Sequence, residues 1–258
     1  MISPYSHLPQ DKWLNKTHEL IAEHPLKEDI IKQIILESWT ILWDTKIGNN
    51  DLKISIQDID LPAQIVGYFL EKIFAKILET RYPQEWQGGK NKEDKDIIYL
   101  PDDRFSLEIK TSGQKGLKIF GNRSYGQKTK NENLEKKSKS GYYITVNFFD
   151  QTINLIRFGW IDFDDWKAQK SQTGQAASLS DYVYQYKLVE IPGEYRLNAP
   201  LEILEGVGGK TAKKLSLLGI NILQDLLKYK GNDTKAVQLR KVLIENIEKY
   251  GYQNKNFD

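Results

Sequence analysis

The sequence predicts an α/β protein in which helices flank a central mixed sheet, followed by a small all-helical domain. Three observations support this prediction. Apolar residues recur at helical spacing through positions 1–80, and short β-branched and aromatic runs bounded by turn residues occupy positions 90–165. A glycine-centred helical pattern follows residue 199. We therefore expect one domain over residues 1–198 and a second over residues 199–258.

The N-terminal part of the chain is predicted to be helical. The expected helices are Trp13–His24, Glu28–Trp43 and Gln64–Tyr82. In the third, apolar residues recur every four positions from Ile65, and one face carries the pattern Gly67-x-x-x-Glu71. Farther along, β-branched and aromatic residues predict strands at Tyr142–Phe149 and Ile153–Trp160, after a helix near Ser124–Lys137.

The stretch Lys95–Ser112 predicts a β-hairpin that brings acidic residues together. An apolar run is followed by turn residues centred on Asp102, and strict alternation then places Glu108 and Lys110 on the polar face. If the hairpin is symmetric about Asp102, Asp96 lies opposite Glu108. Asp102 itself falls in the turn and cannot share that face.

Two carboxylates that face each other across a strand pair repel, and a divalent cation between them reverses the sign of the interaction. Lys110 points the same way and can stabilise a negative transition state or orient a water molecule. An acid-x-Lys triplet alone means little, because this chain contains seven. Only Glu108-x-Lys110 lies in a period-two run with a second acid at the start of an upstream strand. The pattern predicts a metal-dependent hydrolytic site.

With these residues the chain resembles the PD-(D/E)xK nuclease superfamily, which uses Mg²⁺ to cut DNA. The resemblance implies a restriction-endonuclease-like core, with Asp96, Glu108 and Ile109 as metal ligands and Lys110 as the catalytic lysine. It also implies that Mn²⁺ can replace Mg²⁺. The chain departs from the family pattern in having Lys95 where a proline often precedes the aspartate.

The same resemblance makes Glu71 an accessory catalytic acid, because the superfamily often adds one from a Gly-x-x-x-Glu helix. An exposed position on an amphipathic helix explains Glu71 equally well. The choice between the two interpretations stays open at this point.

Composition excludes several other kinds of site. Cysteine is absent, which excludes disulfides and thiolate zinc sites. The three histidines, His7, His18 and His24, all lie near the N-terminus, far in the sequence from Asp96 and Glu108. This argues against a histidine-metal nuclease and against a Ser-His-Asp triad. No apolar run approaches the ~18 residues of a membrane span, and no signal peptide is visible. We expect a cytoplasmic protein that is not bound to a membrane.

A basic segment follows the predicted catalytic strand. Residues 110–142 hold nine basic and two acidic side chains, which suits a polyanionic partner such as double-stranded DNA. Polar residues here and in residues 167–178 suit contacts with bases or phosphates, although an ordinary loop is the competing interpretation. The predicted DNA contacts are Asn122, Arg123, Ser124, Gln127, Gln172, Thr173 and Gln175.

Residues 201–218 carry a second motif, two short apolar helices joined by Gly206-Val207-Gly208. Such glycines leave backbone amides uncovered at the start of the second helix, which makes a phosphate site. The stretch resembles the helix-hairpin-helix motif, which grips the DNA backbone without reading sequence. A P-loop is excluded because position 204 is leucine instead of glycine. The predicted DNA contacts of this motif are Gly206, Val207, Gly208, Lys210, Thr211 and Lys213.

Together the two motifs predict a Mg²⁺-dependent endonuclease that acts on double-stranded DNA. Segments such as SPYSHLPQDKW and EIKTSGQKGLKIFGNRSYGQ resemble type II restriction endonucleases of the ScaI group. This resemblance implies that the enzyme is sequence-specific, and symmetric cutting of both strands would be expected of a homodimer. Two alternatives remain: a structure-specific repair or recombination nuclease of the same superfamily, and a non-catalytic DNA-binding protein.

Overall fold

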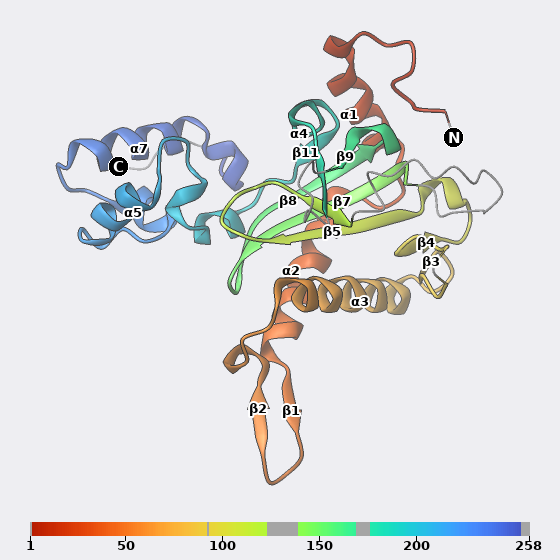
Figure 1. Cartoon of the computed structure of the whole chain (residues 1–258), viewed down its shortest axis with the longest axis horizontal. Helices are drawn as coiled ribbons and strands as arrows, with labels where there is room; N and C mark the ends of the chain where they lie inside the picture. Colours follow the sequence, from red (N-terminus) through yellow and green to blue (C-terminus); the bar gives the residue numbers. More distant parts are fainter. Residues whose placement is uncertain (1, 92, 123–138, 169–175, 254–258) are drawn as a thin grey trace. The chain divides into compact units, whose positions relative to one another are not determined.

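The computed structural model describes the whole chain except residues 1, 92, 123–138, 169–175 and 254–258. The fold is α/β, and a central mixed sheet is flanked by helices, as the sequence predicts (Figure 1). The chain forms two compact units. The first comprises Met1–Ser112, Lys118–Thr145 and Arg157–Val189, and the second comprises Gly113–Leu117, Val146–Ile156 and Glu190–Asp258.

Three helices of the first unit begin and end close to where the sequence predicts them: α1 (Trp13–Glu23), α2 (Glu28–Asp44) and α3 (Ala63–Arg81). A fourth, the short α4 (Asp181–Tyr186), was not predicted. In α2 the fully buried residues Ile31, Ile34 and Ile35 recur at helical spacing, and this apolar face packs against α3. Helices cover both faces of the sheet, with α3 on one side and α1 and α4 on the other (Figure 1).

The central sheet has six strands in the order β11-β8-β7-β5-β4-β3. Their bounds are β3 (Trp86–Gly88), β4 (Ile97–Tyr99), β5 (Leu107–Gly113), β7 (Gly141–Phe149), β8 (Thr152–Ile161) and β11 (Leu188–Glu190). Almost every residue of β7 and β8 is buried. Strands covered on both faces have continuous apolar runs instead of alternation, which is why these two stood out in the sequence.

A second, three-stranded sheet has the order β6-β10-β9, with β6 at Phe120–Asn122, β9 at Trp166–Ala168 and β10 at Ala176–Leu179. The pairing is antiparallel, and Asn122 lies opposite Ala176 while Ala168 lies opposite Ala177. The chain therefore leaves β6 and β9, and enters β10, at the same end of this sheet. The helix predicted near Ser124–Lys137 lies outside the described residues.

One hairpin was missed by the helical interpretation of positions 1–80. Strands β1 (Lys46–Gly48) and β2 (Lys53–Ser55) pair with each other and project from the end of α2 (Figure 1). Strands this short cannot show a period of two. The turn is held by Asn49, whose side-chain oxygen accepts hydrogen bonds from the main-chain N–H groups of Asp51 and Leu52.

A buried ionic cluster fixes the N-terminal segment to the first unit. The Lys187 ammonium, 3% exposed, donates to Asp162 Oδ2 at 2.8 Å and to both carboxylate oxygens of Asp165 at 2.8 and 2.9 Å. Ser3 Oγ donates to the same Asp162 oxygen at 2.7 Å, and the ring of Tyr5 lies 4.5 Å from the ammonium. Buried charges of this kind persist only with close partners, which these side chains provide.

The C-terminal part of the second unit is helical and has its own core. Its helices are the 3-10 turns η6 (Glu194–Asn198), η7 (Leu201–Ile203) and η8 (Ile247–Tyr250), with α5 (Gly209–Ser216), α6 (Leu223–Lys228) and α7 (Thr234–Glu245). Leu201, Val207, Leu215 and Leu223 are among the residues that fill this core. No helix in the described part of the chain is long and apolar enough to cross a membrane.

Candidate active site on the β4–β5 hairpin

The hairpin has the register that the sequence predicts. Ile97 of β4 lies opposite Leu107 of β5, a pairing symmetric about Asp102, so the next pair outward is Asp96 and Glu108. Asp96 is fixed there because its Oδ2 accepts a hydrogen bond from the main-chain N–H of Ile109 at 2.9 Å. Alternation along β5 turns Leu107 into the core and sends Glu108 to the other face.

Three oxygen atoms converge on the ammonium of Lys110. Its Nζ lies 3.1 Å from Glu108 Oε2, 3.1 Å from the main-chain oxygen of Ile109 and 3.5 Å from Asp96 Oδ2. The Glu108 side chain is 1% exposed, and those of Asp96 and Lys110 are 13% and 18% exposed. A positive charge is therefore held at one point by two carboxylates and a carbonyl in a mostly buried setting.

This donor set fits a hard divalent cation. Mg²⁺ takes oxygen ligands and usually keeps several waters, so one or two carboxylates and a carbonyl suffice. Among the described residues no cluster of three or more Asp, Glu, His or Cys side chains could hold a metal. The site can therefore offer two carboxylates and the Ile109 carbonyl.

A second lysine, absent from the sequence predictions, also reaches Glu108. Lys95 Nζ lies 3.7 Å from Glu108 Oε1, the other oxygen of that carboxylate, and donates to the main-chain oxygen of Ser140 at 3.2 Å. The sequence offers one signal for this lysine, its position directly before Asp96. Its reach across the hairpin to β5 could not be deduced from that position.

Helix α3 approaches strand β5 closely at Gly67. A Cβ at that position would lie 2.0 Å from Oγ1 of Thr111, the residue after Lys110, so only glycine permits this approach. One turn later Glu71 is 19% exposed and forms an ion pair with Lys72 at 2.7 Å. The hydrogen bond to Glu71 raises the pKa of Lys72, and the negative charge of Asp96 adds to the rise. Lys72 thus lies within electrostatic reach of Asp96.

Asp102 lies in the turn, as predicted, and is occupied elsewhere. Its carboxylate accepts from the main-chain N–H and the guanidinium of Arg104, with the shortest contact at 2.6 Å.

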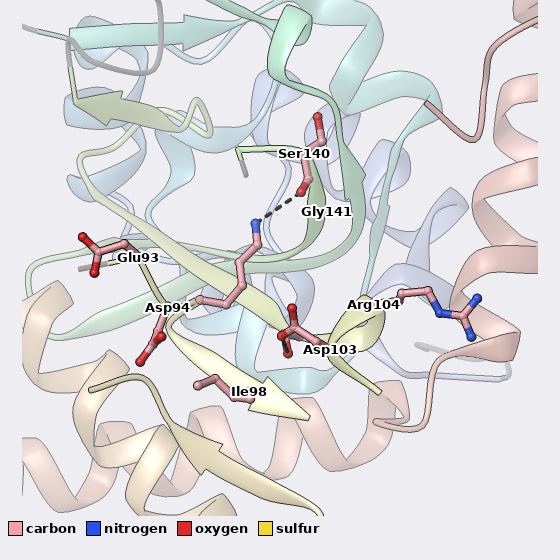
Figure 2. Close-up of a pocket in the computed structure, with 9 residues that line it drawn as sticks. Glu93, Asp94, Ile98, Asp103, Arg104, Ser140 and Gly141 are labelled. Carbon is pink, nitrogen blue, oxygen red and sulfur yellow. Dashed lines mark hydrogen bonds between the residues drawn. The ribbon is translucent and has the colours of Figure 1, made fainter. Parts of the chain in front are cut away.

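Beside the hairpin a cavity of about 160 Å³ opens, lined by Lys95, Ser106 and residues labelled in Figure 2, which include Ile98, Ser140 and Gly141. The Lys95 ammonium thus borders both the cavity and Glu108.

The glycine loop of the second unit has the geometry of an uncovered helix start. Gly206 has a φ of +74°, and Gly208 precedes the first residue of α5. A Cβ added at Gly206 or Gly208 would meet no atom within 4 Å. Val207 packs into the core, whereas Lys210 and Lys213 are exposed and Thr211 is half-buried. Val207 therefore anchors the loop to the core, and the lysines face solvent.

Of the predicted DNA contacts in the first unit, Asn122 is described and is exposed at the end of β6. The others, Arg123, Ser124, Gln127, Gln172, Thr173 and Gln175, lie outside the described residues. The register of the three-stranded sheet places Asn122 opposite Ala176, so the described residues that border the two segments lie at the same end of the sheet.

Comparison with known proteins gives a consistent result. A family model described as ScaI restriction endonuclease matches residues 3–192. The chain is 37% identical over 197 residues to the type II restriction enzyme ScaI of Streptomyces caespitosus, a match that covers 73% of this chain and 84% of that protein. No solved structure matches the chain significantly.

These matches define a sequence-specific type II restriction endonuclease, a nuclease whose substrate is DNA. The chain belongs to the ScaI restriction endonuclease family. The structure-specific repair nuclease and the non-catalytic DNA-binding protein, both open on sequence alone, are set aside by this membership.

Proposed function

We propose that the β4–β5 hairpin is the catalytic centre and that it hydrolyses phosphodiester bonds of double-stranded DNA with Mg²⁺. One observation carries this proposal: Asp96, Glu108 and the Ile109 carbonyl converge on a single cation position. Type II restriction endonucleases generally use divalent metal ions. In the proposed restriction-endonuclease-like core, a hairpin of this kind carries the catalytic residues.

Asp96 and Glu108, with the Ile109 carbonyl, would hold the metal, with Mn²⁺ as an acceptable substitute. Bound there, Mg²⁺ supplies positive charge for the phosphate oxygens during attack by water. Asp96 stays oriented by the Ile109 N–H, and the rigid strand pair keeps the two acids in register. Lys110 lies close enough to donate to the phosphate or to orient the attacking water. Glu71, beside the site on α3, acts as an accessory acid.

The C-terminal region from residue 199 is proposed to be a helix-hairpin-helix domain, distinct from the catalytic domain of residues 1–198. Support comes from the open Gly206-Val207-Gly208 loop at the start of α5 and from the exposed ammonium groups of Lys210 and Lys213. Backbone amides and Thr211 at such a helix start favour phosphate oxygens. This domain would supply affinity and no sequence information.

Sequence reading is assigned to the first unit, to the stretch that begins at Asn122 and the stretch that precedes Ala176, two residues paired at one end of the three-stranded sheet. Asn122, exposed at that end, begins a run that continues through Arg123, Ser124 and Gln127, and Gln172, Thr173 and Gln175 belong to the other segment. Amide and guanidinium side chains are the ones that form bidentate contacts with base edges.

A homodimer is the proposed active form on DNA. One active site cuts one strand, so cutting both strands symmetrically is most simply achieved by two copies related by a two-fold axis. Sedimentation of the protein–DNA complex in Ca²⁺ tests this point. A monomer that still breaks both strands together would contradict it.

The proposed function is tested by digestion of plasmid DNA under four conditions: Mg²⁺, Mn²⁺, Ca²⁺ and EDTA. We expect discrete fragments with Mg²⁺ and Mn²⁺, binding without cleavage in Ca²⁺, and no cleavage in EDTA. Sequencing the fragment ends gives the recognition site and the stagger of the cut. Full activity in EDTA would contradict a metal-dependent hairpin site.

A further inference from the structure

We infer that Lys95 is a positioning residue for Glu108, and this inference rests on the proposed catalytic hairpin. Lys95 is adjacent in sequence to Asp96, yet its side chain serves the other acid of the site. Its Nζ lies 3.7 Å from Glu108 Oε1, while Lys110 Nζ lies 3.1 Å from Glu108 Oε2. Each oxygen of this buried carboxylate thus faces a different ammonium.

The surroundings of Lys95 form a fitted seat for its ammonium. The hydrogen bond to the Ser140 carbonyl, the dashed line in Figure 2, fixes Nζ at the start of β7. The ring of the fully buried Tyr143 lies 5.6 Å from Nζ. At Gly141 a Cβ would come within 3.2 Å of Nζ, so the absence of a side chain there leaves room for the lysine. The Lys95 side chain itself is 12% exposed.

The two lysines have different roles because their anchors differ. The contacts of Lys110 described above are with groups at the cation position, so its ammonium shares that position with any incoming cation. Lys95 donates to the Ser140 carbonyl and faces Oε1, the other oxygen of the Glu108 carboxylate. It therefore keeps Oε1 in place when a cation takes over Oε2. Fixing one carboxylate oxygen sets the direction of the other, which is how outer partners orient metal ligands.

The inference predicts a specific kinetic pattern for Lys95→Met. The cleavage rate at saturating Mg²⁺ should fall by roughly 10–100-fold, the usual effect of losing a partner that orients a ligand. The Mg²⁺ concentration for half-maximal rate should not rise, because removing a nearby positive charge favours cation binding. Lys95→Arg, which keeps the charge, should recover most of the rate. A purely structural defect would not separate the rate from the metal requirement in this way.

The experiment measures single-turnover cleavage of a plasmid across a Mg²⁺ series for wild type, Lys95→Met, Lys95→Arg and the control Lys90→Met. Lys90 is a lysine of the preceding loop, outside the contacts of Glu108 described above. Thermal melting and DNA affinity in Ca²⁺ verify that each variant folds and binds. Lys95→Gln enters the same comparison if Lys95→Met does not fold.

Three outcomes would overturn the inference: a saturating rate within about twofold of wild type, a loss that extra Mg²⁺ restores, or Lys95→Arg as slow as Lys95→Met. Glu108→Ala is measured in parallel to separate this inference from the proposed function. If Glu108→Ala cuts like wild type, the proposed active site is wrong. If Glu108→Ala is inactive and Lys95→Met is normal, only the role of Lys95 is wrong.

Discussion

The β4–β5 hairpin, proposed to be the catalytic centre, and the glycine loop of the C-terminal helices present charge in opposite ways. In the hairpin, the side chains of Asp96, Glu108 and Lys110 are at most 18% exposed and each is fixed by short contacts. In the loop, glycine backbone and exposed lysines face open space. Bond cleavage requires charges held at fixed points, whereas gripping a uniform phosphate backbone requires only accessible donors. The two regions should therefore respond differently to mutation, salt and pH.

The largest expected effect is in the hairpin. Asp96→Ala, Glu108→Ala and Lys110→Ala should each lower the cleavage rate by several orders of magnitude, because losing a charge stabiliser or metal ligand costs about 3 kcal/mol or more of barrier. DNA binding in Ca²⁺ should persist. Single-turnover cleavage measures the loss, and Asp102→Ala, an acid of the same hairpin bound to Arg104, is the control. Near-wild-type cutting by any of the three would remove that residue from the site.

The next effect concerns the packing that holds the hairpin in place. His24 is fully buried, and its Nε2 bonds the carbonyl of Phe105 just before β5. Burial lowers the pKa of His24 to about 4 from 6.5. The stability that depends on the neutral ring is therefore complete above about pH 6.5 and is lost as the pH falls toward 4. The loss should approach roughly 3 kcal/mol.

Urea unfolding at several pH values measures this effect. His24→Gln should lose the part of the pH dependence between about 6.5 and 4, while His18→Gln, on the exposed face of α1, should retain it. Identical pH profiles for wild type and His24→Gln would show that the buried ring does not control acid stability.

A smaller effect is expected in the glycine loop. Gly208→Leu should weaken DNA binding about tenfold on cognate and non-cognate DNA alike, because the side chain would cover the amides proposed to face phosphates. Gly208 has ordinary extended backbone, so the substitution is not strained. Binding to several sequences is measured by titration.

Replacing Lys210 and Lys213 together by alanine tests the same loop through the salt dependence of DNA binding. The dependence of log affinity on log salt should become shallower by about two, since each phosphate contact releases roughly one counterion. Titrations at several salt concentrations give the slope. A changed preferred site with an unchanged slope would mean that the loop reads bases.

The smallest effect is expected for the surface pair within the second unit. Lys115 donates to Glu202 at 2.5 Å, and this bond lowers the pKa of Glu202. Both side chains are partly exposed, so Lys115→Ala should change stability by less than about 1 kcal/mol, and less still at high salt. Thermal melting at two salt concentrations measures it. A larger, salt-independent loss would indicate that Lys115 acts through packing on Phe149, whose ring lies 5.1 Å away.

The sequence predicted the hairpin register because period-two alternation and a turn centre determine which residues face each other. Asp96 and Glu108 could be paired in this way from the sequence alone. The position of the Lys95 ammonium could not be predicted in this way. It depends on Ser140 and Gly141, which are distant in sequence and are brought near by the order of the strands in the sheet. Local patterns contain no information about such contacts.

The β1–β2 hairpin shows a different limit. Its strands are short, and the paired Ile47 and Ile54 are 52% and 43% exposed. Burial usually imposes an alternating pattern of apolar and polar residues on a strand. Because these strands are exposed, their sequence does not show that pattern. Asn49 and the following turn residues were the available signal, and they were outweighed by the helical periodicity on both sides.

The buried Lys187 cluster has a consequence for anyone who shortens this chain. Residues ahead of the first helix are often trimmed as dispensable tails, yet here Ser3 completes the hydrogen bonding of Asp162 and Tyr5 covers the ammonium with its ring. Deleting them would expose a buried cation to solvent and leave Asp162 short of one donor. Trimming or proteolytic clipping at this end should therefore loosen β8 and α4, because Asp162 directly follows β8 and Lys187 directly follows α4. This would happen although none of the residues predicted to contact DNA is removed.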